Sequence, residues 1–239
     1  MQKSGAINFH SEISSTFDEK YTKSPQFLER KQLWERFLGN YCRSTDRALD
    51  LGCGSGVFTI LLSQLAADVV AVDGSKDMLV LCKSKIEKLG LSNVRLIETD
   101  IKDLFKHSFE KFDLVLCSSV LEYLDDIDGS IQLINDLLNP GGHFIFSIPN
   151  RTSFYRKLEP LVYRLSGRPR YFGYIKQLFS QTEIKEKLYK CGFEMLTHEY
   201  FGKTPILSDV FRPMGISQFS DNLLLVVSRS TTKSGTVLE

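Results

Sequence analysis

The sequence predicts an α/β protein with a doubly wound, mostly parallel sheet and helices on both of its faces. Between residues 47 and 149, short apolar runs alternate with segments that carry apolar residues at helical spacing. The apolar runs are rich in Val, Leu and Ile, as expected of strands covered on both faces. The chain has 239 residues, which is long enough to bury a core without disulfides or metals.

Five strands are expected in this region, over residues 48–51, 69–73, 94–99, 112–117 and 143–148. Helices are expected between them over 57–66, 76–89 and 129–138. Gly90 stands where a left-handed residue ends the second helix. Residues 139–142, Asn-Pro-Gly-Gly, are expected to form a turn.

The flanking segments suggest how the chain is organised. Residues 1–45 are expected to form an N-terminal helical cap, with an amphipathic helix over 26–41, and residues 46–150 form the core. A basic and aromatic insertion over 151–180 is expected to act as a lid. Residues 181–230 complete the core with a helix over 181–190 and two strands, near 194–200 and 222–227, that pair as a hairpin at the sheet edge. Residues 231–239 read as a disordered tail.

Composition limits the class of protein. The net charge is +1, so no global field attracts nucleic acid or an acidic membrane. The five cysteines are scattered and never spaced as CxxC, which argues against a zinc site or a disulfide framework and for a reducing compartment. The first thirty residues hold no apolar run, and no segment approaches a membrane span. A cytoplasmic protein is therefore expected.

The most informative segment leaves the first expected strand and opens the first helix, and it reads Asp-Leu-Gly-Cys-Gly-Ser-Gly from Asp50 to Gly56. Glycines let the backbone approach a ligand, and the helix N-terminus behind them offers free N–H groups. A dinucleotide fingerprint would need a further glycine at position 57, which is Val57. A nicotinamide enzyme is therefore disfavoured, although a glycine loop by itself can be only a tight turn.

This loop resembles motif I of class I S-adenosylmethionine-dependent methyltransferases, which is D/E-x-G-x-G-x-G. The resemblance covers about residues 46–229, with Asp73, Asp100 and the Pro-Gly-Gly of 140–142 at the usual intervals. It implies a Rossmann-like sheet of seven strands, with the last strand antiparallel. It also implies S-adenosylmethionine as cofactor and S-adenosylhomocysteine as product.

The resemblance also implies a role for each residue of the cofactor site. The expected site comprises Asp50, Gly52, Gly54, Gly56, Asp73, Gly74, Met78, Asp100, Ile101 and Ser118. Asp50 would orient the glycine loop and meet the cofactor's amino group, directly or through water. Asp73 would accept bonds from both ribose hydroxyls with its two oxygens, and Asp100 would meet the adenine amino group beside the Ile101 backbone. Purely structural alternatives remain for these residues. Asp73 and Asp100 can cap helices, Met78 can pack in the core, and Ser118 can simply end a strand.

The acceptor side is expected to begin at residues 118–124, because the resemblance places this segment at the methyl end of the cofactor. The whole chain, including residues 17–21, looks most like the ubiquinone-biosynthesis O-methyltransferases. That branch carries two glutamates and a histidine here, which resemble a metal site. Only Glu122 remains in this chain, beside Ser119 and Tyr123, so no metal is expected and a catechol acceptor is in doubt.

Three side chains are candidates for acting on the acceptor: Glu122, Tyr123 and His198. Tyr123 could position or deprotonate an acceptor, or only pack beneath the lid. His198 could act as a base from its late strand, and His10 could reach the site if its segment folds over. A base matters for a phenol of pKa about 10, and less for an acceptor that is already nucleophilic.

The insertion over 151–179 holds seven basic residues, seven aromatic residues and a single acid, Glu159. We expect a lid over a small-molecule acceptor of amphipathic or anionic character, held at a membrane surface by peripheral contact. The alternative is a solvated basic face over an aromatic mini-core. A nucleic-acid acceptor is not expected, because residues 117–120 read Cys-Ser-Ser-Val and lack the motif of nucleobase amino methyltransferases.

Taken together, these patterns predict methyl transfer to a small molecule, with oxygen favoured over nitrogen or carbon as the acceptor atom. The remaining alternative is a protein that binds the cofactor without catalysis and serves a partner.

Overall fold

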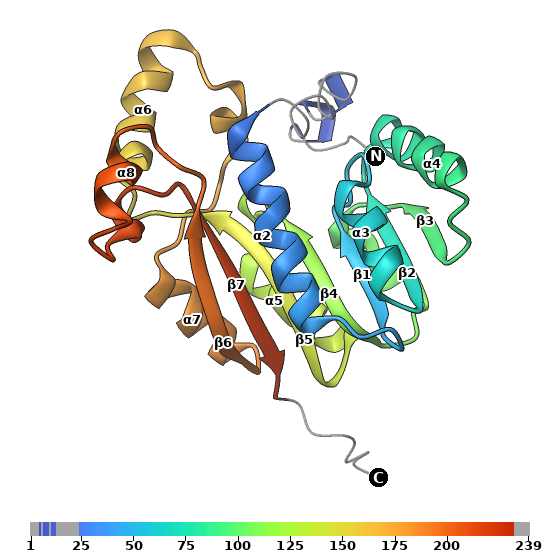
Figure 1. Cartoon of the computed structure of the whole chain (residues 1–239). Coiled ribbons are helices and arrows are strands. Elements are labelled where there is room, and N and C mark those ends of the chain that lie inside the picture. Colours follow the sequence, from blue (N-terminus) through green and yellow to red (C-terminus); the bar gives the residue numbers. More distant parts are fainter. Residues whose placement is uncertain (1–4, 6, 10, 13–23, 232–239) are drawn as a thin grey trace.

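Seven strands form one sheet in the order β3-β2-β1-β4-β5-β7-β6 (Figure 1). Their bounds are β1 Arg47–Leu51, β2 Asp68–Asp73, β3 Val94–Glu98, β4 Phe112–Ser118, β5 Leu138–Pro149, β6 Phe193–Phe201 and β7 Leu223–Ser230. β1 pairs in parallel with β2 and β4, while β7 is antiparallel to both β5 and β6. The predicted seven-stranded, mostly parallel sheet with an antiparallel last strand is confirmed.

The computed structural model describes residues 5, 7–9, 11–12 and 24–231. The segment 17–21, His10 and residues 232–239 of the predicted tail lie outside the described residues. Within the described part, no helix is both long enough and apolar enough to cross a membrane.

Alternate residues along the central strands enter different apolar clusters. Leu49 and Val115 pack on one face of the sheet, and Ala48 and Leu114 pack on the other. All four are fully buried. The near-continuous apolar runs in the sequence are explained by this burial on both faces.

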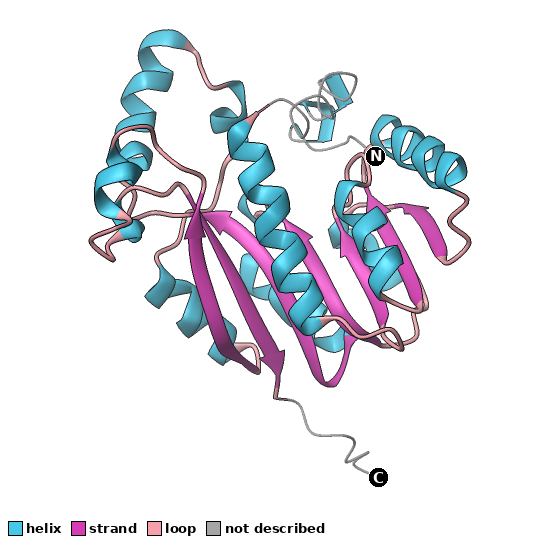
Figure 2. Ribbon diagram, in the orientation of Figure 1, coloured by secondary structure: helices cyan, strands magenta, loops and turns pink. Residues whose placement is uncertain are grey.

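Helices cover both faces (Figure 2). α2 (Pro25–Tyr41), α3 (Val57–Leu65) and α4 (Lys76–Leu89) lie on one face, and α5 (Ile127–Leu137) and α7 (Gln181–Lys190) lie on the other. Their ends follow local chemistry. The Ser75 hydroxyl accepts from the Met78 N–H at the start of α4, and Gly90 ends it with φ 65°. Ser180 and Glu183 form a capping box on α7.

Two expectations need adjustment. β6 and β7 do pair at the edge of the sheet, but residues 202–222 separate them, and this connection holds the helix α8 (Leu207–Phe211) and the 3-10 turn η4 (Ser217–Phe219). They therefore form no tight hairpin, and β7 inserts between β5 and β6. Residues 139–142 belong to β5 as its irregular start, because Gly141 has φ 78° and the register with β4 shifts between Phe112 and Leu114.

The insertion after β5 forms α6 (Phe154–Ser166) and the 3-10 turn η3 (Arg170–Tyr174). The two segments meet through Tyr163 and Phe172, whose ring centroids lie 5.1 Å apart. Both stand beyond the carboxyl ends of the parallel strands (Figure 1). Two further 3-10 turns, η1 (Ile101–Lys106) and η2 (Leu121–Tyr123), follow β3 and β4 at the same edge. This is the edge at which doubly wound sheets bind ligands.

The face of α2 that packs on the sheet generates a stability prediction. Leu38 is fully buried among aromatic side chains, whereas Leu28 on the same helix is 40% exposed. Leu38→Ala should lower the free energy of unfolding by about 2–5 kcal/mol, because it leaves a cavity. Leu28→Ala should cost about 0.5 kcal/mol or less. Urea unfolding of both variants checks this, and equal losses would contradict the packing described for α2.

Candidate active site

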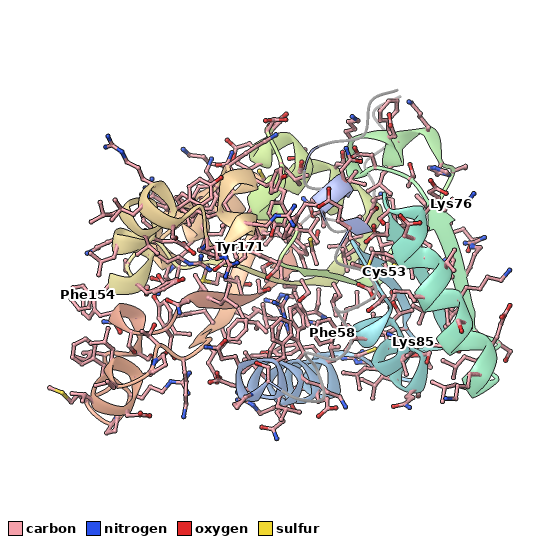
Figure 3. All side chains as sticks on the ribbon, turned by 90° about the horizontal axis from the view of Figure 1, so that it is seen from above. Cys53, Phe58, Lys76, Lys85, Phe154 and Tyr171 are labelled. Carbon is pink, nitrogen blue, oxygen red and sulfur yellow. The ribbon has the colours of Figure 1, made fainter. Side chains whose placement is uncertain are left out.

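A cavity of about 640 Å³ opens where β1, β2 and β4 end, and its size suits a small-molecule site, roughly 300–1,000 Å³. Part of its wall, the loop half, comes from Gly52, Cys53, Gly54, Asp73, Gly74, Met78, Asp100, Ile101 and Ser118. Another part, the cap half, comes from Arg30, Glu122, Tyr123, Arg156, Tyr171, Phe201 and Leu223. In Figure 3, Tyr171 lies between Phe154 of α6 and Cys53 of the glycine loop.

The three glycines of the loop have different tasks. Gly52 and Gly56 have φ of 75° and 86°, and a Cβ on either would lie 2.3–2.4 Å from Val120 or Cys82 side-chain atoms. Both therefore permit close packing in a left-handed conformation. Gly54 also has a positive φ, of 54°, but a Cβ there would meet nothing within 4 Å. Because Gly54 lines the cavity, it leaves backbone open to a ligand.

Asp73 ties this loop to the end of β2. Its Oδ2 accepts from the Gly54 N–H at 2.8 Å, and its Oδ1 accepts from the Ser75 N–H at 2.7 Å. Since Ser75 itself caps α4, Asp73 does not serve as that helix's cap. A carboxylate oxygen can accept more than one hydrogen bond, and Asp73 lines the cavity beside these two contacts.

Asp50 lies behind the loop and is not part of the cavity wall. It is buried, and its Oδ2 accepts from the Thr59 hydroxyl at 2.6 Å. Burial raises the pKa of Asp50 to about 7, and the charge of Asp73 adds to the rise. The expected direct contact of Asp50 with the cofactor has no support in this geometry, whereas its expected role in orienting the loop is consistent with the bond to α3.

The remaining residues expected around adenosine also line the cavity. Met78 and Ile101 are buried in its wall, and Asp100 lies in the wall as the cap of η1, accepting from the Lys102 N–H at 3.4 Å. Gly74 lines the wall beneath the Ile7 side chain. Ile7 belongs to the predicted N-terminal cap, which thus contributes to the cavity.

A cation that was not predicted from the sequence, Arg30 of α2, contacts the end of β4. Arg30 on α2 donates through Nη2 to the Ser118 and Ser119 hydroxyls, at 2.5 and 3.0 Å. Its buried Nε donates to no described residue. Ser119 holds a φ of 55°, which is unusual outside glycine and is found where function or packing enforces it. The signal in the sequence was spacing, since Arg30 falls between Phe27 and Trp34 on the apolar stripe of its helix.

Glu122 is the buried acid of the cap half. It is only 3% exposed, and its Oε2 meets no hydrogen-bond partner among the described residues. Burial raises the pKa of Glu122 to about 7, although Arg30 and Arg156 oppose the rise. Its backbone carbonyl accepts from the N–H groups of residues 176 and 177, at 2.8 and 3.1 Å. Those bonds connect the end of β4 to the lid segment.

Tyr123 also lines the cavity and is half-buried. Burial, and then the charge of Glu122, raise its pKa above the ordinary value of a phenol. A phenol with a raised pKa stays protonated, so it donates a hydrogen bond and is a poor base.

A buried polar network holds the lid against the cavity. Arg156 donates through Nη1 to Glu159 at 2.6 Å and through Nε to the Asn222 carbonyl at 3.2 Å. The Tyr171 hydroxyl donates to the other oxygen of Glu159 at 2.9 Å. Glu159 is fully buried, while Arg156 and Tyr171 line the cavity. The lone acid of the insertion is therefore the anchor that orients two cavity residues.

His198 does not reach the site, which corrects the expectation that it acts as a base. It is exposed on the edge strand β6 and packs edge-on against Tyr200, with ring centroids 5.5 Å apart. The strand reaches the cavity only at Phe201. At about 3.3 Å per residue, His198 stands roughly 10 Å short of that point.

No group of three or more His, Cys, Asp or Glu side chains among the described residues could hold a metal ion. The cap half has one buried carboxylate, Glu122, and two phenols, Tyr123 and Tyr171, where a divalent site would need several oxygen ligands. The Gly54 opening and the Asp73 carboxylate do fit a nucleoside with hydroxyl groups, because they combine close backbone approach with a charged acceptor.

The chain resembles known methyltransferases in sequence. A family model described as a methyltransferase domain matches residues 43–196. The ubiquinone biosynthesis O-methyltransferase of Azorhizobium caulinodans is 30% identical over 151 residues, which cover 62% of this chain and 59% of the relative. That of Acinetobacter baylyi is 28% identical over 105 residues, 44% of each chain. The chain thus matches about half the length of these curated relatives.

Solved structures share the fold at low sequence identity. The N-methyltransferase NodS of Bradyrhizobium japonicum WM9, in complex with S-adenosylhomocysteine, aligns with a TM-score of 0.68 at 19% identity, over 96% of this chain and all of that one. The [4+2]-cyclase SpnF aligns with a TM-score of 0.71 at 14% identity, over 98% and 99% of the two chains.

The matched domain covers most of the sheet and the whole glycine loop, and the cavity lies where that loop meets β2 and β4. The chain therefore belongs to the methyltransferase domain family.

Proposed function

We propose that this protein is an S-adenosylmethionine-dependent methyltransferase that transfers the methyl group to an oxygen atom of a small molecule held in the cap half of the cavity. The observation that carries the proposal is the Glu122 carboxyl, which is buried in the cavity wall with one oxygen unpartnered among the described residues. An acceptor hydroxyl is the natural donor to such an oxygen. The name shared by the curated relatives, ubiquinone biosynthesis O-methyltransferase, supports oxygen as the acceptor atom.

The loop half would hold the cofactor. Asp73 would accept bonds from the ribose hydroxyls while keeping its own bond to the Gly54 N–H. Met78 and Ile101 would pack on the adenine ring, with Asp100 beside its amino group. Gly56 and Asp50 would shape the loop from behind, and Gly52 would do so from within the cavity wall.

Ser118 and Arg30 would meet the methionine end of the cofactor. The guanidinium already lies on the Ser118 hydroxyl at 2.5 Å, and it is the cation of the wall nearest the end of β4. A carboxylate is the group that an arginine fork recognises best. Arg30 therefore suits the methionine carboxylate, and this pose would leave the methyl group facing the cap half.

The cofactor supplies a methyl group on a positively charged sulfur, which is a strong donor. The protein then has to hold the acceptor oxygen about 3 Å from the methyl carbon, in line with the sulfur, and keep water out. Glu122 would accept the acceptor's proton as the new bond forms. Its raised pKa of about 7 suits this task near neutral pH.

Arg156 and Tyr171 would position the acceptor from the lid. Arg156 donates through Nε and Nη1 to partners in the protein, and its guanidinium also lines the cavity. A guanidinium nitrogen in a cavity wall favours an acceptor with an anionic group.

The experiment that tests the proposed function is S-adenosylhomocysteine formation with a panel of phenols, carboxylated phenols and amines. Turnover of amines alone would refute it.

The ribose role of Asp73 predicts a loss of cofactor affinity. Asp73→Ala should weaken binding of S-adenosylhomocysteine by about 1–3 kcal/mol, because the hydroxyl groups lose a charged acceptor. Calorimetric titration measures this, with exposed Asp77→Ala in the first turn of α4 as the control. Unchanged affinity in Asp73→Ala would exclude the ribose contact.

Glu122 predicts a pH dependence. A general base must be deprotonated, so kcat/KM should rise as the pH rises through about 7, the pKa of Glu122. Glu122→Gln should reduce kcat by about 10²–10⁴-fold and remove this rise. Asp125→Asn, which changes an exposed acid of the cavity rim, should keep the wild-type profile. A Glu122→Gln enzyme that still shows the rise would assign the titration to another group.

Tyr123 predicts a separate effect on turnover. If its hydroxyl donates to the acceptor, Tyr123→Phe should lower kcat by about tenfold, the loss of one hydrogen bond of roughly 1.4 kcal/mol. Affinity for S-adenosylhomocysteine should not change, because Tyr123 belongs to the cap half. Equal turnover of the two enzymes would reduce Tyr123 to a packing role.

A further inference from the structure

The helix α6 is amphipathic, but its apolar stripe faces solvent. The exposed stripe consists of Phe154, Leu158, Leu161, Val162 and Leu165, spaced by three and four residues so that they share one face. Leu165 is 79% exposed. The residues that α6 buries are Arg156 and Glu159, an ion pair. This is the reverse of a helix that covers a protein core.

A second exposed apolar stripe adjoins the first. α8 and its flanks expose Ile206, Val210 and Met214, at intervals of four residues. Phe154 of α6 lies 5.9 Å, between ring centroids, from Phe211 of α8. Figures 1 and 2 show the two helices side by side at one end of the molecule. We call this combined surface the α6–α8 face.

The backbone of this face is strained at Ile206. This residue has φ 68°, a left-handed conformation that a β-branched residue adopts only under constraint. Its side chain is nevertheless 77% exposed, so no core packing explains the strain. A strained segment that presents an apolar side chain to solvent is typical of a binding surface.

Charge identifies the kind of partner. The exposed side of α6 and its C-terminal end carry Lys157, Arg164 and Arg168, which form no ion pair with a described residue. The single acid of α6, Glu159, is buried and already bound to Arg156 and Tyr171. The exposed acid nearby is Asp209 on α8, so the α6–α8 face is apolar at its centre and mainly positive around it.

We propose that the α6–α8 face docks on a membrane surface that contains anionic lipid. Exposed leucines that insert at the headgroup boundary, flanked by Lys and Arg, are the pattern of an interfacial helix. A second copy of this chain fits less well, because a symmetric contact would bring the same basic residues together.

Docking there would place the cavity beside the membrane. Arg156 and Tyr171 belong to the segment that carries the apolar stripe, and both line the cap half. An amphipathic acceptor dissolved in the bilayer could then enter the cavity without crossing water. This consequence rests on the proposed function, whereas the docking itself does not.

The experiment is flotation of the full chain with vesicles of phosphatidylcholine alone and of phosphatidylcholine mixed with phosphatidylglycerol, without cofactor or acceptor. Binding to the anionic vesicles at low salt, reduced by added salt, is the expected result. No binding to either vesicle at low salt would overturn the proposal, as would self-association of the chain through this face in place of vesicle binding. Neither outcome bears on methyl transfer, which is assayed separately.

Two pairs of variants locate the contact. Leu161→Gln/Leu165→Gln should lower vesicle affinity about tenfold or more, because two leucines no longer insert. Val80→Gln/Leu89→Gln removes comparable exposed apolar surface from α4 and should bind like the wild type. Arg164→Gln/Arg168→Gln should lower vesicle affinity about fivefold for each charge removed, at low salt. The control Lys88→Gln/Lys190→Gln should bind vesicles like the wild type.

Folding and the active site serve as internal checks. None of these substituted residues lines the cavity, so every variant should keep wild-type affinity for S-adenosylhomocysteine and an unchanged thermal midpoint. A loss of vesicle binding equal in the α4 controls and the α6 variants would show non-specific adhesion and would overturn the assignment to the α6–α8 face.

Discussion

The parallel pairing of β1 with β2 and β4 is the constraint on which the rest of this structure depends. Parallel neighbours end at the same edge of a sheet, so Leu51, Asp73 and Ser118 are brought together although 67 positions of sequence separate the first from the last. The carboxylate of Asp73 then secures the glycine loop through the Gly54 N–H. The cavity is a consequence of this convergence, because the strands stop and the chain turns away from one shared point.

Buried charge is distributed around the cavity in two different ways. The pair of Arg156 and Glu159 is mutually satisfied and shared with the Tyr171 hydroxyl, and so it holds structure in place. Glu122 has an unpartnered oxygen among the described residues and a raised pKa. An incompletely satisfied buried acid destabilises the fold, since its ionisation is opposed by burial. Such a cost is usual at a site where the group acts on a ligand.

The lid, residues 151–180, contributes both to the cavity and to the exposed α6–α8 face. Its inner side offers Arg156 and Tyr171 to the cavity, and its outer side presents the apolar stripe of α6. A helix that buries its ion pair and exposes its leucines makes physical sense when both sides have a partner. The geometry of the lid therefore connects the character of the acceptor with the place where the acceptor is found.

The sequence by itself determined the fold and the cofactor loop, because both depend on local patterns. Apolar runs, helix caps such as Ser75 and Gly90, and the spacing from Asp50 to Gly56 each act within a few residues of chain. Tertiary structure alone decided which side chains share the cavity. Arg30 meets Ser118 across 88 positions of sequence, and His198 stays on an exposed edge despite its suitable chemistry. The outward direction of the apolar stripe of α6 could likewise not be predicted from the sequence. Periodicity shows that a helix has an apolar face, and only packing decides where that face points.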